Sequence, residues 1–191
     1  MNKKFLYVLC VMIFITTAAL AQTIFVKANV TGANNGSSWQ NAYTTLQPAL
    51  NAATAGTQIW VAAGTYKPTV KAAEEDAAGN PTIDRDKAFV LKADVEIYGG
   101  FVGTETELDQ RNWKTNLTIL SGDLDNNGAL SDGGAHHVVI FVGDVGDACL
   151  DGFTITGGNA NIAHVNSVYI NGYNVYRHCG GGVHNINSSP P

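Results

Sequence analysis

The stretch Leu150-Asp-Gly-Phe-Thr-Ile-Thr-Gly-Gly-Asn-Ala160 reads as an apolar start, a turn, a short alternating strand and a glycine corner. Successive side chains of a strand point to opposite faces, so Phe153 and Ile155 share one face and the threonines the other. The two glycines that follow let the backbone bend where a side chain would clash. One such strand has nothing to pack against, so the fold depends on whether the pattern recurs.

The pattern of alternating apolar residues followed by small, glycine or polar residues does recur. Earlier copies are Ile59-Trp-Val-Ala-Ala-Gly64, Val95-Glu-Ile-Tyr-Gly-Gly100, Leu117-Thr-Ile-Leu-Ser-Gly122 and Val139-Ile-Phe-Val-Gly-Asp144. The last three begin 22 residues apart. A fixed period of about this length, with one short strand per copy, predicts a β-solenoid in which each turn stacks its strand on that of the turn before.

This period also predicts which side chains stack inside the coil. Two internal columns are expected: Val95, Leu117 and Val139 in one, and Ile97, Ile119 and Phe141 in the next. Residues 150–158 follow too closely behind the third copy to extend these columns. We expect them to form part of a second sheet within the same coil.

Four stretches carry a resemblance to a known family: residues 59–66, 97–106, 118–123 and 150–160. They resemble the N-terminal part of right-handed parallel β-helix surface proteins of Bacteroidetes-type bacteria. That family shares the pectin-lyase-like fold and is similar to the repeat region of chlamydial polymorphic membrane proteins. The resemblance covers about residues 23–185. It implies an all-β, right-handed parallel β-helix and implies little about activity.

The first 21 residues have the parts of a secretory signal peptide. Lys3-Lys4 gives a positive start, residues 5–15 an apolar core, and residues 19–21 a small-x-small cleavage site. The apolar run is too short to span a bilayer comfortably, so we expect cleavage before Gln22 and no transmembrane span. The mature chain, residues 22–191, is then the N-terminal portion of a β-helix domain, located outside the cell or on the bacterial outer surface.

Composition agrees with export. Charged residues make up only 14% of the chain and glycine 21 of its 191 residues, which suits a β-rich extracellular protein better than a helical cytosolic one. The net charge is −5, and removing Lys3-Lys4 lowers it to −7. Because no basic cluster could neutralise phosphates, we expect no nucleic-acid partner.

A short helix is predicted before the first repeat copy, from Thr44 or Thr45 to about residue 55, with Gly56 as its stop signal. Its apolar face consists of Leu46, Ala49, Leu50 and Ala53. Such a helix would cover the open end of the solenoid, which otherwise exposes apolar surface and unpaired strand edges. We expect Trp39 and Tyr43 to pack beside it.

Residues 67–87 interrupt the period with acidic, glycine and proline runs, which predicts a solvated insertion between coils. The alternative is a binding loop, since inserted loops on solenoids often lie on the working face. Cys149 and Cys179 remain after signal cleavage. They could pair, as cysteines of exported proteins do, or be small buried residues of the coil.

One loop has the pattern of a metal site. Asp123, Asp125 and Asn127 place oxygen ligands at alternate positions before a glycine, as the first half of a calcium loop does. The final acidic ligand is missing because Gly134 stands in its place, and Asp132 would have to substitute for it. We predict a structural calcium at Asp123, Asp125, Asn127 and Asp132 that ties a loop between coils. The alternative is a plain turn without an ion.

The sequence offers no clear catalytic set. None of the three arginines stands in the Arg-x-Pro setting of pectate-type lyases. Hydrolases need paired carboxylates, and the candidates Asp144, Asp147 and Asp151 lie in a turn-rich region without the pectin-hydrolase signatures. The histidines lack the spacing of a zinc protease. We therefore predict no catalytic residue and no bound cofactor other than the calcium.

We expect a secreted or cell-surface non-catalytic β-helix protein, adhesin-like or structural, with an extracellular glycan or a host or cell-surface protein as partner. The alternative is the N-terminal fragment of a polysaccharide lyase or glycoside hydrolase of the same fold. A third possibility is a carbohydrate-binding module that uses an exposed Trp113 or Tyr98. Residues 180–187 start another coil that is not capped before Pro191, so we expect a truncated product or a longer parent protein.

Overall fold

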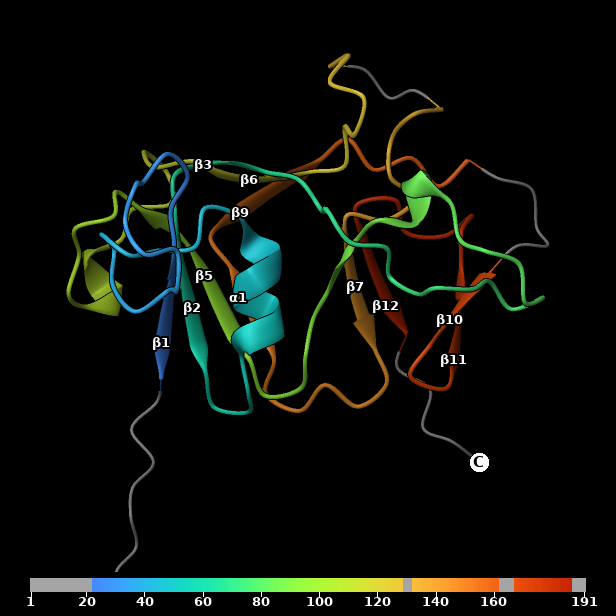
Figure 1. Ribbon diagram of the computed structural model, residues 1–191, viewed down its shortest axis with the longest axis horizontal. Coiled ribbons are helices and arrows are strands. Elements are labelled where there is room, and N and C mark those ends of the chain that lie inside the picture. The colour runs from blue at the N-terminus through green and yellow to red at the C-terminus, as the bar shows by residue number, and fades with distance from the viewer. Residues whose placement is uncertain (1–21, 129–131, 162–166, 187–191) are drawn as a thin grey trace, which may run out of the picture.

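The computed structural model describes residues 22–128, 132–161 and 167–186 (Figure 1). Strand accounts for 34% and helix for 8%, so the fold is largely β, as predicted. The predicted signal peptide, residues 1–21, lies outside the described residues. None of the described helices is long and apolar enough to cross a membrane.

Ten strands form three parallel sheets, each named here after its central strand. The β5 sheet has the order β1 (Thr23–Val26), β2 (Gln58–Ala62), β5 (Glu96–Phe101), β8 (Cys149–Asp151). The β6 sheet has the order β3 (Gly64–Tyr66), β6 (Thr118–Ser121), β9 (Phe153–Thr156). The β7 sheet has the order β4 (Phe89–Val90), β7 (Val139–Val142), β12 (Val183–Ile186). Two further strands, β10 (Ser167–Ile170) and β11 (Tyr173–Tyr176), form an antiparallel hairpin.

The chain visits the three sheets repeatedly in one order. Strands β2, β3 and β4 are followed by β5, β6 and β7 and then by β8, β9 and β12, and each run gives one strand to each sheet. Figure 1 shows the β5 sheet at the left, the β6 sheet along the top and the β7 sheet at the right, with the hairpin outside the β7 sheet. The sheets therefore enclose a common interior.

The predicted columns are wrong. Val95 directly precedes β5, Leu117 directly precedes β6 and Val139 opens β7, so the three residues belong to three different sheets. The second predicted column, Ile97, Ile119 and Phe141, fails for the same reason. The 22-residue spacing measures the step from one sheet to the next within a single run of strands.

The return to the same sheet takes a longer and variable stretch of chain. Paired residues are 35 positions apart for Thr23 and Gln58 but 54 apart for Gly64 and Thr118. The difference arises because loops of unequal length are inserted between the strands. Residues 150–158, assigned from the sequence to one sheet, instead contribute β8 to the β5 sheet and β9 to the β6 sheet.

The stacked positions follow the observed register. In the β5 sheet Ile59 pairs with Ile97, which pairs with Leu150. In the β6 sheet Leu120 lies between Tyr66 and Ile155. Ile97 and Leu120 are fully buried, and they join the main hydrophobic core inside the sheets.

A second, smaller core lies on the other face of the β7 sheet. Ile140 and Val142 of β7 pack there with Val168, Ile170 and Val175 of the hairpin. Since the alternate residue Val139 faces the main core, β7 is buried on both faces. The hairpin thus covers the outside of the β7 sheet.

The predicted helix is present as α1 (Leu46–Ala52), shorter at its C-terminal end than expected. Its four predicted apolar residues, Leu46, Ala49, Leu50 and Ala53, are all buried in the main core. The helix contacts β1, β2 and β4, which include the first edge strands of two sheets. This position agrees with the predicted covering role.

The two aromatic residues expected beside the helix take different places. Tyr43 packs against the main core. Trp39 instead lies against Phe25 and Phe101, with ring centroids 4.8 and 5.5 Å away, and Phe101 stacks on Trp60 at 4.8 Å. These four rings form an aromatic layer that holds the loop after β5, because the Trp39 indole N–H donates to the Glu105 carbonyl at 2.8 Å.

The glycine corner predicted after β9 is confirmed at Gly158. A Cβ atom there would lie 1.8 Å from the carbonyl oxygen of Gly181, which shortly precedes β12. No side chain fits such an approach, so glycine is required where these two segments touch.

Candidate functional site

The candidate site is a surface hollow of about 680 Å³ beside the β5 and β6 sheets. One wall consists of Arg111, Trp113, Lys114 and Leu117, which belong to the loop between β5 and β6. The other wall consists of residues 150–154, which run from β8 into β9. The hollow is called the Trp113 hollow below.

The loop that carries the first wall is held by its own hydrogen bonds. The Glu105 carboxylate accepts from the backbone N–H groups of Val102, Gly103 and Thr104 at 2.6, 2.8 and 2.9 Å. Burial opposes ionisation, but these amide donors hold the pKa of Glu105 below its usual value. After the short 3-10 turn η2 (Leu108–Gln110), the loop reaches Trp113 on an ordered backbone.

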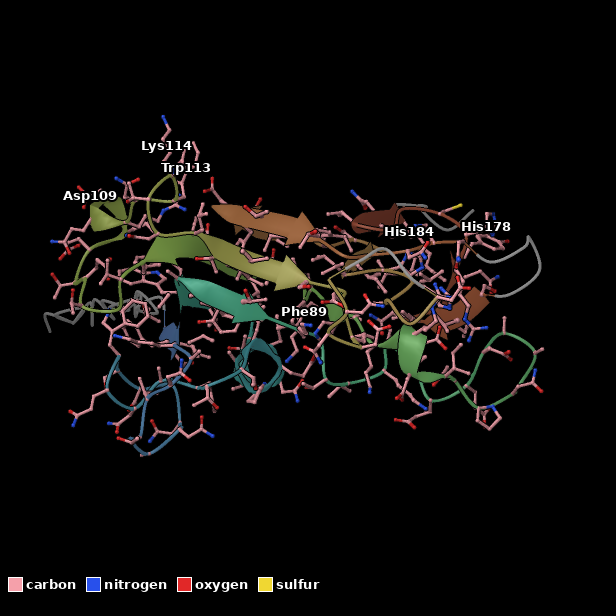
Figure 2. All side chains as sticks on the ribbon, turned by 90° about the horizontal axis from the view of Figure 1, so that it is seen from above. Phe89, Asp109, Trp113, Lys114, His178 and His184 are labelled. Atoms are coloured by element: carbon pink, nitrogen blue, oxygen red, sulfur yellow. The ribbon has the colours of Figure 1, made fainter. Side chains whose placement is uncertain are left out.

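Trp113 is half exposed, as the carbohydrate-binding alternative requires. Its backbone lies directly against Gly100, where a Cβ atom would come within 2.7 Å of the Trp113 nitrogen and Cα. Gly100 has a φ of +97°, a conformation that favours glycine. The close approach fixes the backbone of Trp113 and leaves the indole free to project outward (Figure 2).

Charged groups flank the indole. The Lys114 ammonium lies 5.2 Å from the Trp113 ring centroid, within the range of a cation–π contact. Figure 2 shows both side chains projecting from the loop away from the sheets. Leu117, 53% exposed, adds apolar surface to the same wall.

Arg111 ties the two walls together. Its guanidinium donates to the Asp151 carboxylate at 2.7 Å and to the Gly99 carbonyl at 3.2 Å. It also lies 5.0 Å from the ring centroid of Tyr98. Burial and the neighbouring Glu96 raise the pKa of Tyr98, so its hydroxyl stays protonated at neutral pH.

The arrangement suits binding rather than bond breaking. An exposed indole offers a flat apolar face, and the Arg111–Asp151 pair offers donors and acceptors at its side. A sugar ring presents an apolar C–H face and a rim of hydroxyl groups, which is the complementary pattern. Of the carboxylates considered for hydrolysis, Asp151 is held by Arg111, and Asp144 accepts the N–H of Gly146 at 3.0 Å within its own turn.

A lysine side chain from outside the loop, that of Lys67, contacts the loop that was predicted to bind calcium. The Lys67 ammonium donates to the carbonyl oxygen of Asp123, lies 3.3 Å from its carboxylate and donates to the Asn126 side chain at 2.7 Å. Asp123 also accepts the backbone N–H groups of Asn127 and Gly128 at 3.1 and 3.3 Å. Its oxygen atoms therefore already have donors.

The other predicted calcium ligands are also engaged. Asp125 accepts the side-chain amide of Asn127 at 2.9 Å, and Asp132 accepts that of Asn161 at 2.5 Å. Among the described residues, no group of three histidine, cysteine or acidic side chains is placed to hold a metal. Calcium at these positions stays a prediction, and binding there would require Lys67 to move.

Cys149 and Cys179 are both free thiols that are partly buried. Burial and the nearby Asp151 raise the pKa of Cys149. The two residues are not joined in this structure, and neither is fully buried as the alternative reading of the sequence expected.

A second hollow of about 640 Å³ lies between the insertion, residues 67–87, and the hairpin. Glu74, Glu75 and Asp76 line one side, and Tyr169 and Asn174 the other. Asp76 accepts the backbone N–H groups of Ala78 and Asn80, both at 2.9 Å, so its carboxylate shapes the loop.

The sequence pointed to Trp113 and Tyr98 as candidate ligand-binding aromatics and to Asp151 only as a candidate hydrolase carboxylate, and Arg111 and Lys114 were not singled out. The adjacency of Lys114 to Trp113 was a usable signal. The pairing of Arg111 with Asp151, 40 residues later, depends on the stacking of β8 beside β5 and has no local signal.

Comparison with known proteins adds nothing to this geometry: no protein-family model, no curated protein and no solved structure matches the chain.

Proposed function

We propose that this chain is a secreted or cell-surface protein with a right-handed parallel β-helix fold, adhesin-like or structural, that binds an extracellular glycan without transforming it. The fold part is supported by the three runs of strands that visit the β5, β6 and β7 sheets in the same order. Connections between parallel strands of one sheet are right-handed in the great majority of proteins, which supports the hand.

Export rests on the sequence. The positive start, apolar core and small-residue cleavage site of residues 1–21 are the parts of a signal peptide. The low proportion of charged residues and the many glycines agree with an extracellular β-rich protein.

The Trp113 hollow carries the ligand part of the proposal. An indole that is 50% exposed costs free energy in water unless a partner covers it, and its backbone is fixed by the contact with Gly100. A fixed aromatic platform binds at little entropic cost. The adjoining Arg111–Asp151 pair and Lys114 would hydrogen-bond the hydroxyl or acidic groups of a sugar stacked on the ring.

The test is a glycan array followed by calorimetry with the purified chain. We expect Trp113→Ala to weaken binding of the best array ligand by tenfold or more, about 1.4 kcal/mol. Tyr169→Ala is the matched control, because Tyr169 is similarly exposed, at 55% against 50% for Trp113, but lies at the second hollow.

Three results would contradict the proposal: no glycan bound, equal loss in both variants, or turnover of a polysaccharide by the chain. Turnover would favour the alternative of a lyase or hydrolase fragment. Cell fractionation of a tagged chain tests export separately, and retention in the cytoplasm would refute that part.

A further inference from the structure

Two adjacent histidines are buried where the β7 sheet meets the insertion and the hairpin. His136 and His137 directly precede Val138 and β7, and their exposed fractions are 0% and 3%. Neither ring nitrogen of His136 makes a well-formed hydrogen bond, although the Asn159 backbone lies beside the ring, and Nε2 of His137 has no partner. Nδ1 of His137 lies 3.2 Å from the Gly180 carbonyl oxygen. Orphaned polar atoms at such depth are uncommon and call for a physical explanation.

Beside these rings lies a buried ion pair that joins the insertion to the hairpin. Arg177, which follows β11, donates to both carboxylate oxygens of Asp86 at 2.6 and 2.7 Å. Asp86 belongs to the 3-10 turn η1 (Asp84–Asp86) at the end of the insertion. A second carboxylate, Asp76, lies 3.8 Å from the same guanidinium. This pair of Asp86 and Arg177 is called the latch below.

The charges that face the histidines are mostly positive or already paired. His136 faces Arg85 and Arg177, with Asp86 as the facing acid. His137 faces His136, His184 and Asp86.

Hydrogen bonds hold Arg85 in its place beside the rings. It is fixed by hydrogen bonds to the carbonyl groups of Gly134 and Asn159 at 2.7 and 2.6 Å, and it also faces Asp132.

Protonation of either ring would therefore place a cation beside one acid, Asp86, that Arg177 already neutralises. Burial, aided by Arg85, lowers the pKa of His136 to about 4, and burial lowers that of His137 to about 4 as well. Neutral rings fit the site. A charged His136 is repelled by both arginines, a charged His137 would be repelled by His136 and His184 if these were protonated too, and either one competes with Arg177 for Asp86.

We propose that His136 and His137 make the latch acid-sensitive: their protonation separates Asp86 from Arg177 and releases the insertion and the hairpin from the β7 sheet, while the β5 and β6 sheets stay folded. The smaller core between β7 and the hairpin is separate from the main core, so it can open alone. The second hollow is formed by the two released segments, and it would disappear with them.

Hydrogen exchange of the full chain, read peptide by peptide and corrected for the intrinsic effect of pH, tests this directly. Between about pH 7 and pH 4, we expect exchange in residues 67–87 and 167–177 to rise at least tenfold relative to residues 23–62. Tryptophan emission is an internal control because Trp39, Trp60 and Trp113 all lie on the side of the β5 sheet. It should stay constant while the latch opens.

Variants decide the role of each group. His136→Gln, His137→Gln and the double variant should shift the opening to lower pH. Asp86→Asn should open the same segments at neutral pH, which identifies the latch as the element released. If His136→Gln does not fold, His137→Gln and Asp86→Asn still decide the proposal.

The proposal fails if the wild-type segments stay protected near pH 4, if both halves of the molecule open together, or if the histidine variants keep the wild-type midpoint.

Discussion

Arg177 and Asp86 form a bidentate ion pair across 91 residues of sequence, with both side chains almost fully buried. Removing Asp86 leaves the buried Arg177 guanidinium with only the more distant Asp76 carboxylate, 3.8 Å away, as its counter-charge. We expect Asp86→Ala to lower the free energy of unfolding by about 3–5 kcal/mol, measured by urea denaturation. Replacing both residues, as Asp86→Leu with Arg177→Met, should cost clearly less than the single change. Equal costs for the two variants would mean that the pair itself contributes little.

The register of the β6 sheet predicts that truncating two leucines three residues apart changes the free energy of unfolding by very different amounts. Leu120 is fully buried between Tyr66 and Ile155, whereas Leu117 is 53% exposed in the Trp113 hollow. Leu120→Ala should lower the free energy of unfolding by about 2–5 kcal/mol, and Leu117→Ala should change it by less than about 0.5 kcal/mol. Denaturant unfolding of both variants checks the register. A large cost at Leu117 with none at Leu120 would instead restore the column predicted from the sequence.

The strands were predictable because each has a local signal. Alternating apolar residues mark β5, β6 and β7, and the helix α1 follows from its apolar face and its terminal residues. The stacking was not predictable from the same signal. Three equally spaced strand patterns can be stacked in one sheet, one from each turn, or can belong to three different sheets within one turn. Only the contacts between distant segments distinguish these two arrangements.

The candidate site was predictable only in part, for the same reason. Trp113 and Tyr98 stand out as aromatic residues in polar surroundings. Asp151 becomes part of the site because β8 pairs with β5 in parallel, with Asp151 beside Tyr98. The insertion was likewise predicted to be solvated because of its charged residues. Nothing in the local sequence indicates that Asp86 is buried and paired with the distant Arg177.

The buried histidines predict how stability depends on pH. Their pKa values of about 4 lie below the value of about 6.5 expected in the unfolded chain. Between these values the unfolded chain binds more protons than the native one, so stability is fully present above pH 6.5 and falls as the pH decreases towards 4. With two such groups the loss approaches about 2.7 kcal/mol per pH unit in the steepest region.

Urea denaturation at a series of pH values measures this slope. His136→Gln should remove about half of it, and His184→Gln serves as the comparison at a histidine whose Nδ1 has a partner, the Cys179 carbonyl oxygen at 2.8 Å. A slope unaffected by His136→Gln would assign the acid sensitivity to other groups.

The loop around Asp123 predicts a competition between Lys67 and calcium. The Lys67 ammonium contacts the carbonyl and the carboxylate of Asp123 and the side chain of Asn126, so it occupies the space that a bound ion would share with them. Although burial opposes ionisation, the hydrogen bond from Lys67 helps to hold the pKa of Asp123 below its usual value. Lys67→Ala should lower the melting temperature by roughly 2 °C, since the pair is partly exposed.

Millimolar calcium should then raise the melting temperature of Lys67→Ala and leave the wild type almost unchanged, because only the variant offers carboxylate and amide oxygens without a competing ammonium. Adding Asp125→Asn to the variant should abolish the gain, which separates binding in this loop from a general salt effect. Magnesium provides a second control, since it demands a tighter octahedral geometry. An equal rise in the melting temperature of the wild type would mean that calcium binds without displacing Lys67. No rise in either chain would mean that the loop is a turn that does not bind calcium.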